Sequence, residues 1–100
     1  MKGILYYTED YIKGKLIETD GIVSTHVHET KYVNLPKLRD ILLDGISDNG
    51  HRCISVYRHA FILHGDVYNV CLSCGDFYKN DEFFYLTKSA VEKFKKETEL

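Results

Sequence analysis

Residues 52–73 read RCISVYRHAFILHGDVYNVCLS, and this stretch decides the fold. Two runs of residues typical of strands, 52–64 and 67–73, flank the pair Gly65-Asp66. We expect this pair to form a two-residue turn, because glycine and aspartate tolerate the backbone conformations that such turns require. The stretch therefore predicts an antiparallel hairpin in which the numbers of facing residues sum to 131.

The predicted hairpin assigns each side chain to one of two faces, because side chains alternate along a strand. One face is mostly apolar and consists of Cys53, Tyr57, His59, Phe61, Leu63, Tyr68, Val70, Leu72 and Cys74. The opposite face carries Cys71, which should lie across from Ala60. In this register the sulfurs of Cys71 and Cys74 point to opposite sides of the sheet.

Upstream of this hairpin, the sequence predicts three shorter strands. Residues 4–7 form the first. Residues 11–19 and 22–29 form the other two, and they flank Asp20-Gly21, a pair favoured in two-residue hairpin turns. We therefore expect a second antiparallel hairpin in the N-terminal third of the chain.

Two segments have the spacing of apolar residues that is typical of helices. The first covers residues 35–44, and Gly45 follows it at the position where glycine commonly ends a helix. The second covers about 89–98, where Ser89 and Glu92 have the spacing of a capping box. Each helix is apolar on one side only, so each should cover a sheet.

The 100 residues form a single domain, residues 1–100, because a chain of this length has room for one core. A last strand signal at 82–86 gives the order three strands, helix, three strands, helix. The sequence thus predicts an α+β fold, with a mostly antiparallel sheet of about six strands and both helices on one face.

Charge and composition disfavour several classes of function. The net charge is -2, so no overall positive field attracts nucleic acid or anionic lipid. Neither the N-terminus nor any other stretch has the apolar run of a signal peptide or a membrane span, and we expect a cytoplasmic protein without membrane contact.

Cys71-x-x-Cys74 has the spacing of a zinc site or a redox pair. If the strand ends at Leu72 and residues 73–76 turn, the two sulfurs can meet. Cys53 and His59 then complete a candidate Cys3His set for zinc. The alternative is that the thiols are buried and structural, since free cysteine behaves as a small hydrophobe.

The arrangement of Cys53, Arg58-His59 and Cys71-Leu72-Ser73-Cys74 resembles a pattern in small uncharacterised bacterial proteins. The resemblance covers about a quarter of the chain. It implies that these residues form one unit, and it implies no activity.

A polar face of the N-terminal hairpin forms a second candidate site. In the expected register Lys15 faces His26, and Lys13 faces His28. The lysines disfavour a metal ion between the histidines, because like charges repel across a strand pair. A solvated face is one interpretation, and a patch that binds anions more strongly when the histidines are protonated is the other.

Eight tyrosines in so small a chain favour a protein-interaction module, since tyrosine is enriched at interfaces. An inhibitor, an immunity-type protein or an accessory regulator would fit, and self-association stays open. The candidate contact residues are Tyr78, Phe83, Phe84, Tyr85, Tyr6, Tyr7 and Tyr11. The alternative is that these rings cover the sheet beneath the helices.

A metal-stabilised or metal-sensing module is the second interpretation, and a thiol-dependent enzyme is the third. Cys74 would lie diagonal to His59, but the sequence offers no third group to orient such a pair. We therefore identify no catalytic residue and expect the protein not to be an enzyme.

Overall fold

The computed structural model describes residues 2–10, 14–18, 27–50 and 56–99. In this part of the chain the elements are β1 (Gly3–Tyr7), β2 (Glu29–Val33), α1 (Leu35–Asp44), β3 (Ile46–Ser47), β4 (His59–Leu63), β5 (Asp66–Cys71), β6 (Asp76–Lys79), β7 (Glu82–Leu86) and α2 (Lys88–Thr98). The expected α+β class is confirmed. The described residues form seven strands rather than about six, in the order two strands, helix, five strands, helix.

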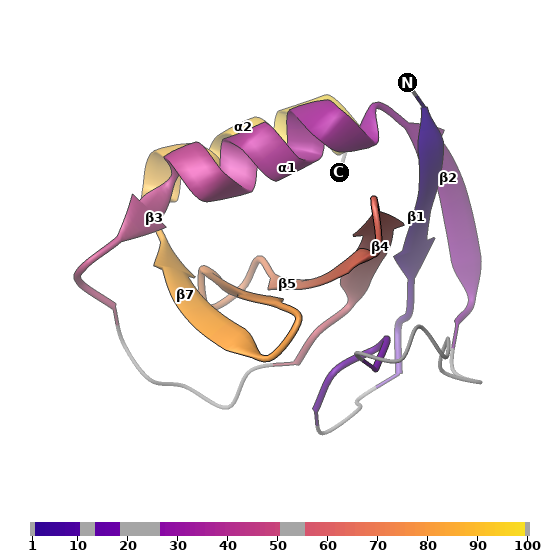
Figure 1. Ribbon diagram of the computed structural model, residues 1–100, viewed down its shortest axis with the longest axis horizontal. Helices are drawn as coiled ribbons and strands as arrows, with labels where there is room; N and C mark the ends of the chain where they lie inside the picture. Colours follow the sequence, from indigo (N-terminus) through magenta and orange to yellow (C-terminus); the bar gives the residue numbers. More distant parts are fainter. Residues whose placement is uncertain (1, 11–13, 19–26, 51–55, 100) are drawn as a thin grey trace.

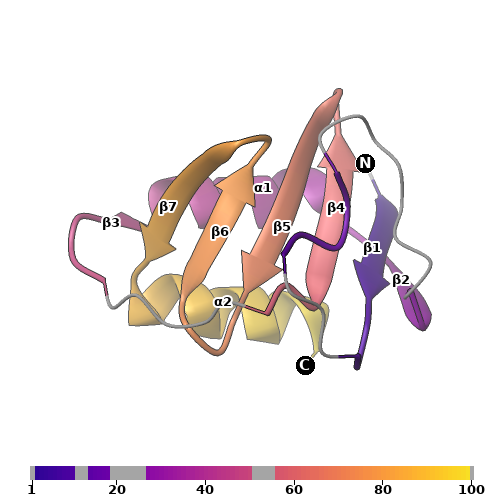
Figure 2. The same ribbon diagram turned by 90° about the horizontal axis from the view of Figure 1, so that it is seen from below.

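All seven of these strands belong to one antiparallel sheet, in the order β2-β1-β4-β5-β6-β7-β3. Both helices cover the same face of the curved sheet, which we call the helix face (Figure 1). Residues 14–18, which we call the strap, run across β4 on the other face (Figure 2). We call this second face the strap face.

β4 and β5 form the predicted hairpin, but its turn is His64-Gly65, one residue earlier than expected. Both turn residues have positive φ, 51° and 81°. The register shifts by two residues, so the side chains of β4 and β5 keep their predicted faces although their partners change. Tyr57 precedes β4 and does not keep its predicted face, because its ring contacts Tyr78 on the strap face. Ala60 faces Asn69 rather than Cys71.

The predicted hairpin over residues 11–29, with its Asp20-Gly21 turn, falls mostly outside the described residues. The strap is the described part of its first strand, and it is not a regular strand. An isolated parallel bridge joins its residue Gly14 to Val56. β1 pairs with β2 on one side and with β4 on the other. β2 lies further along the chain than the strand expected over residues 22–29.

α1 has the predicted bounds, because the sequence around it supplies both ends. The side chain of Asn34 caps the first turn and accepts a hydrogen bond from the Lys37 backbone N–H at 3.1 Å. At the other end the Gly45 N–H donates to the carbonyls of Ile41 and Leu42. Gly45 also allows close packing of the helices, since a Cβ there would collide with Ala90 of α2.

α2 begins at Lys88, and Thr87 is its N-cap rather than Ser89. The Thr87 hydroxyl accepts a hydrogen bond from the Ala90 N–H at 3.1 Å. The predicted capping box is therefore wrong by two residues.

Each face of the sheet has its own core. The core of the helix face consists of Leu5, Leu35, Leu38, Leu42, Phe61, Leu63, Tyr68, Val70, Phe77, Leu86, Ala90, Val91 and Phe94. The smaller core of the strap face consists of Leu16, Ile17, Ala60 and Val67. Beside it, the buried Asn69 side chain holds the Ile17 backbone, accepting from its N–H at 3.0 Å and donating to its carbonyl at 2.8 Å.

Candidate functional site

The turn between β5 and β6 brings two cysteines together. Residues 72–75 form this turn, and the Gly75 N–H donates to the Cys71 carbonyl at 3.0 Å. Gly75 has a φ of 74°, a conformation that glycine adopts without steric cost. Because the chain turns here instead of continuing as a strand, the expectation that Cys71 and Cys74 point apart is wrong.

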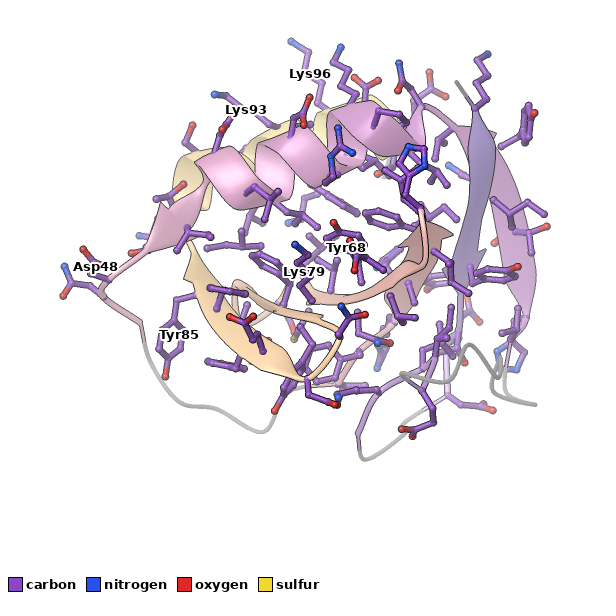
Figure 3. The ribbon with its side chains drawn as sticks, viewed as in Figure 1. Asp48, Tyr68, Lys79, Tyr85, Lys93 and Lys96 are labelled. Atoms are coloured by element: carbon purple, nitrogen blue, oxygen red, sulfur yellow. The ribbon has the colours of Figure 1, made fainter. Side chains whose placement is uncertain are left out.

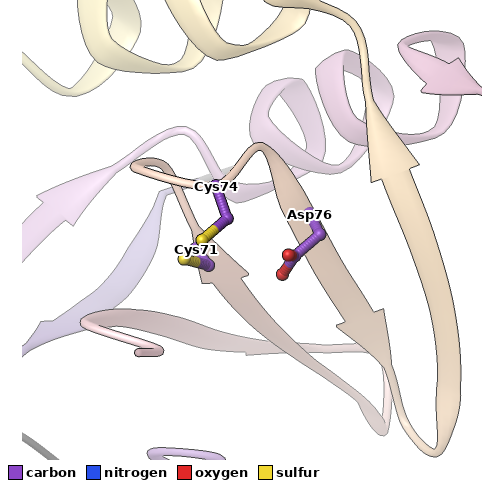
Figure 4. Close-up of side chains that lie close together, drawn as sticks. All are labelled: Cys71, Cys74 and Asp76. Carbon is purple, nitrogen blue, oxygen red and sulfur yellow. The ribbon is translucent and has the colours of Figure 1, made fainter. Parts of the chain in front are cut away.

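Asp76, the first residue of β6, completes the group (Figure 4). It faces Cys71 across the ladder between β5 and β6. The two Sγ atoms and a carboxylate oxygen of Asp76 all lie within 4.8 Å of one another. We call Cys71, Cys74 and Asp76 the cysteine–aspartate group.

The two cysteines of this group differ in chemical state. Cys71 is a free thiol, only 1% exposed, with its Sγ atom 3.4 Å from the Ser73 hydroxyl. Cys74 is partly exposed and is disulfide-bonded. Sulfur and carboxylate oxygen are both zinc ligands, but a thiolate and not a disulfide sulfur binds the metal. The group can therefore hold a metal ion only after Cys74 is reduced.

A surface pocket of about 710 Å³ reaches this group from the solvent. Its lining includes Cys74 and Gly75 from the turn, Tyr85 from β7, and Asp48 from the segment that follows β3. Cys74 is thus accessible to small molecules, whereas Cys71 lies beneath it.

His59 does not join the two cysteines, although it belongs to the predicted zinc set. It lies on the helix face, where its ring is 5.0 Å from the ring of Tyr7 and 6.3 Å from that of Phe94. Neither ring nitrogen has a hydrogen-bond partner among the described residues. Burial, together with the smaller effect of the nearby positive charges of Lys31 and Arg58, lowers the pKa of His59 from 6.5 to about 4.

Of the other members of that set, Cys53 lies outside the described residues. Asp76 takes part in the observed group but was not among the predicted ligands. A signal for it existed, because Asp76 follows Cys74 by two residues and closes the 73–76 segment that was weighed as a turn.

Three of the predicted contact residues lie together on the strap face of β6 and β7. The ring of Phe83 is 5.4 Å from the ring of Tyr78 and 4.9 Å from that of Tyr85, in edge-to-face contacts. Tyr85 projects away from both helices (Figure 3). We call Tyr78, Phe83 and Tyr85 the aromatic surface. The buried Tyr57 supports it from beneath, 5.5 Å from the ring of Tyr78.

The remaining predicted contact residues lie elsewhere. Phe84 stacks on Phe77 of the helix-face core at 5.2 Å, and Tyr7 lies beside His59 on the same face. Tyr6 packs against the core of the strap face. Tyr11 lies outside the described residues.

A second exposed pair was missed by sequence reasoning. Ile4 of β1 and Tyr32 of β2 face each other across the ladder, and they are 45% and 69% exposed. β2 was not predicted as a strand, so no alternation pattern was available to place Tyr32 on a face.

Of the four residues of the predicted anion patch, the structure describes Lys15 and His28. Lys15 donates to Asp81 Oδ1 at 2.7 Å and lies over the ring of Tyr78. The Nδ1 atom of His28 lies 2.9 Å from the Thr8 hydroxyl. Lys13 and His26, the other two members, lie outside the described residues.

No family of proteins, no curated protein and no solved structure matches this chain. Neither helix in the described part of the chain is long and apolar enough to cross a membrane.

Proposed function

We propose that the protein is a small interaction module that binds another protein through the aromatic surface. An inhibitor, an immunity-type protein or an accessory regulator would act in this way. The observation that carries the proposal is the contact between Tyr78, Phe83 and Tyr85 on the sheet face that the helices leave uncovered.

The alternative explanation, that these aromatic rings serve to cover the sheet beneath the helices, applies to some of them only. Phe84 and Tyr7 do lie beneath the helices. Phe83, in contrast, is 36% exposed and belongs to neither core. Adjacent aromatic rings with polar hydroxyl tips are typical of the centres of protein interfaces.

Site-specific photo-crosslinking tests this proposal. A photoreactive phenylalanine analogue replaces Phe83, and in a matched control it replaces Lys93, which points outward from α2 (Figure 3). We expect the probe at position 83 to capture one partner in cells of the natural host, and the probe at position 93 not to capture it. A crosslink between two copies of this chain would identify self-association as the interaction.

Binding of the purified partner then provides the quantitative test. Phe83→Ser should weaken the affinity at least about tenfold, as expected for an aromatic residue at the centre of an interface. Lys93→Ser should leave the affinity unchanged. Identical capture from both positions, or equal affinity of both variants, would rule the aromatic surface out.

A metal-binding module is the second candidate, and the 4.8 Å separation within the cysteine–aspartate group favours it. After reduction, two thiolates and one carboxylate offer three of the four ligands of a tetrahedral zinc site. Native mass spectrometry of the reduced protein with one equivalent of zinc tests this candidate. We expect one bound ion, lost in Cys71→Ser and kept in the control Asp81→Asn, whereas an apo spectrum of folded, reduced protein would exclude it.

A further inference from the structure

We propose that β2 is an association edge, at which two copies of this chain pair antiparallel and join their sheets into one. Three features of β2 carry this proposal: its length as an edge strand, the outward direction of its backbone groups, and the complementarity of its charges to those of a second copy. The proposal is independent of the aromatic surface, because β6 and β7 lie on the other side of the sheet from β2.

The two edges of the described sheet differ in length. β3, at one edge, has two residues, whereas β2, at the other edge, has five (Figure 1). A very short edge strand offers few hydrogen bonds to an added strand, but a longer one is a template for pairing. β2 is therefore the edge of this sheet that can accept a further strand.

The backbone of β2 has hydrogen-bonding groups that point away from β1. The Tyr7 carbonyl points toward the β2 side, where it accepts from the His28 N–H at 2.9 Å. Glu29 is the ladder partner of Tyr7, so its own backbone groups point toward β1. Because this direction alternates along an antiparallel strand, the N–H and carbonyl groups of Thr30 and Tyr32 point outward. Within the described part of the chain, no residue pairs with them.

The charges of β2 select one register with a second copy. Glu29 and Lys31 are two residues apart, so their side chains lie on the same face of the strand. If two antiparallel copies meet with Thr30 facing Thr30, each Glu29 faces Lys31 of the other copy, and two ion pairs form. The next register that pairs the outward groups places Lys31 opposite Lys31, and like charges directly opposite are destabilising.

The side chains of β2 are positioned for this register. Lys31 Nζ donates to the Thr98 carbonyl at 2.8 Å, which holds the ammonium group on the helix face. Among the described residues, no ion pair occupies Glu29. On the opposite face Tyr32 is 69% exposed, and in the dimer its ring would lie beside Thr30 of the second copy. One pairing thus satisfies the outward backbone groups, matches the charges and covers an exposed ring.

Exchange of the two charges, followed by analytical ultracentrifugation, tests the proposal. Glu29→Lys should weaken the dimer at least about tenfold, because both cross-strand pairs then place lysine opposite lysine. Lys31→Glu should weaken it similarly, since glutamate then faces glutamate. The control Lys93→Glu makes the same change of charge at an exposed position of α2 and should leave the affinity unchanged.

Two combinations of these variants distinguish lost pairing from lost folding. An equimolar mixture of Glu29→Lys and Lys31→Glu should form a heterodimer, because every facing pair is then again of opposite charge. The double variant Glu29→Lys/Lys31→Glu should dimerise like the natural protein for the same reason. Circular dichroism verifies that each variant folds, and a folded double variant that stays monomeric would overturn the proposal.

The natural protein itself gives the most direct outcome. A single monomeric species at about 1 mM protein would overturn the proposal, because even a dissociation constant of that size leaves a detectable dimer. The open edge would then be left to a strand of another protein. Equal affinity of the natural protein and of both single variants would also overturn it.

Cysteine crosslinking tests the register. Thr30→Cys places two thiols opposite each other in the proposed dimer, and oxidation should link the copies covalently. Tyr32→Cys should give far less of this product, since position 32 does not face itself. The natural protein, treated in the same way, reports any link made by its own cysteines. A stronger link from Tyr32→Cys would overturn the proposed register and with it the pairing of Glu29 with Lys31.

Discussion

The two faces of the sheet are closed by different means. On the helix face, two helices supply leucine, valine and aromatic side chains that fill a continuous core. On the strap face, an irregular segment is held by the amide of Asn69 and by a core of four residues. The aromatic surface and the cysteine–aspartate group lie on this same face, beside the part of the sheet that the strap covers. Helix packing thus stabilises this fold, whereas its chemically distinctive side chains gather on the face that the helices leave open.

Substitutions at two adjacent residues of β6 should show the largest difference in the free energy of unfolding between the two faces. Phe77 is fully buried in the helix-face core, and Tyr78 lies on the strap face. Phe77→Ala should lower the free energy of unfolding by about 3–5 kcal/mol, because it leaves a large cavity. Tyr78→Ala should cost about 1–2 kcal/mol, since it loses edge-to-face ring contacts. Urea unfolding measures both, and equal losses would mean that the two faces contribute alike.

His59 is a buried titratable group on the helix face, so the free energy of unfolding should depend on pH through its protonation. Its pKa is about 4 in the folded state and 6.5 ordinarily, so between these values the unfolded chain binds more protons. The free energy of unfolding therefore has its full value, as far as His59 is concerned, above pH 6.5, and it decreases as the pH falls toward 4. The shift corresponds to a loss of about 3 kcal/mol between pH 7 and pH 4.

Unfolding experiments at several pH values isolate this effect when His59→Phe is compared with the natural protein. Phe removes the titrating group and keeps a ring against Tyr7 and Phe94, so the difference in stability should grow as the pH falls. His64→Asn is the matched control, because His64 is exposed and asparagine tolerates its positive φ. A constant difference across this pH range would show that His59 is not the group responsible.

The strap depends on Asn69, so its removal should affect the strap face alone. Asn69→Leu leaves the Ile17 N–H and carbonyl without their partners, and we expect a loss of about 2 kcal/mol. Hydrogen exchange should show faster exchange at the Ile17 amide and unchanged protection in α1. Asn49→Ala, at an exposed position, serves as the control and should change stability by less than about 0.5 kcal/mol. Unchanged protection of Ile17 would show that the core alone holds the strap.

The sequence was informative where one local pattern determines the structure. Alternation over 59–70 placed Phe61 and Val70 on the same face even though the turn was displaced by one residue, because a register shift of two residues preserves side-chain direction. α1 was predicted with its bounds because Asn34 and Gly45 mark its two ends. These features depend on neighbouring residues, so no tertiary information was needed.

The candidate site depends on contacts that sequence spacing alone cannot decide. A strand continuing to Cys74 and a turn ending at Gly75 fit the same residues, and only the pairing of Asp76 with Cys71 selects the turn. Alternation predicted His59 on the same face as Cys74. The turn instead brings Cys74 to Cys71 and Asp76, whereas His59 lies on the helix face beside Phe94. The strap was also unpredictable, since the Asn69 amide that holds it lies more than fifty residues away.

The smallest expected effect concerns the start of α2, where the predicted N-cap, Ser89, differs from the observed N-cap, Thr87. Ser89 and Glu92 have capping-box spacing, but the hydroxyl that accepts the Ala90 N–H belongs to Thr87. Thr87→Ala should therefore cost about 1 kcal/mol in urea unfolding, the usual value of an N-cap. Ser89→Ala should change stability by less than about 0.5 kcal/mol, because Ser89 lies inside the helix and is exposed. The reverse order of effects would place the helix start at Ser89, as the capping box implies, and would shift the Ala90 contact with Gly45 along with it.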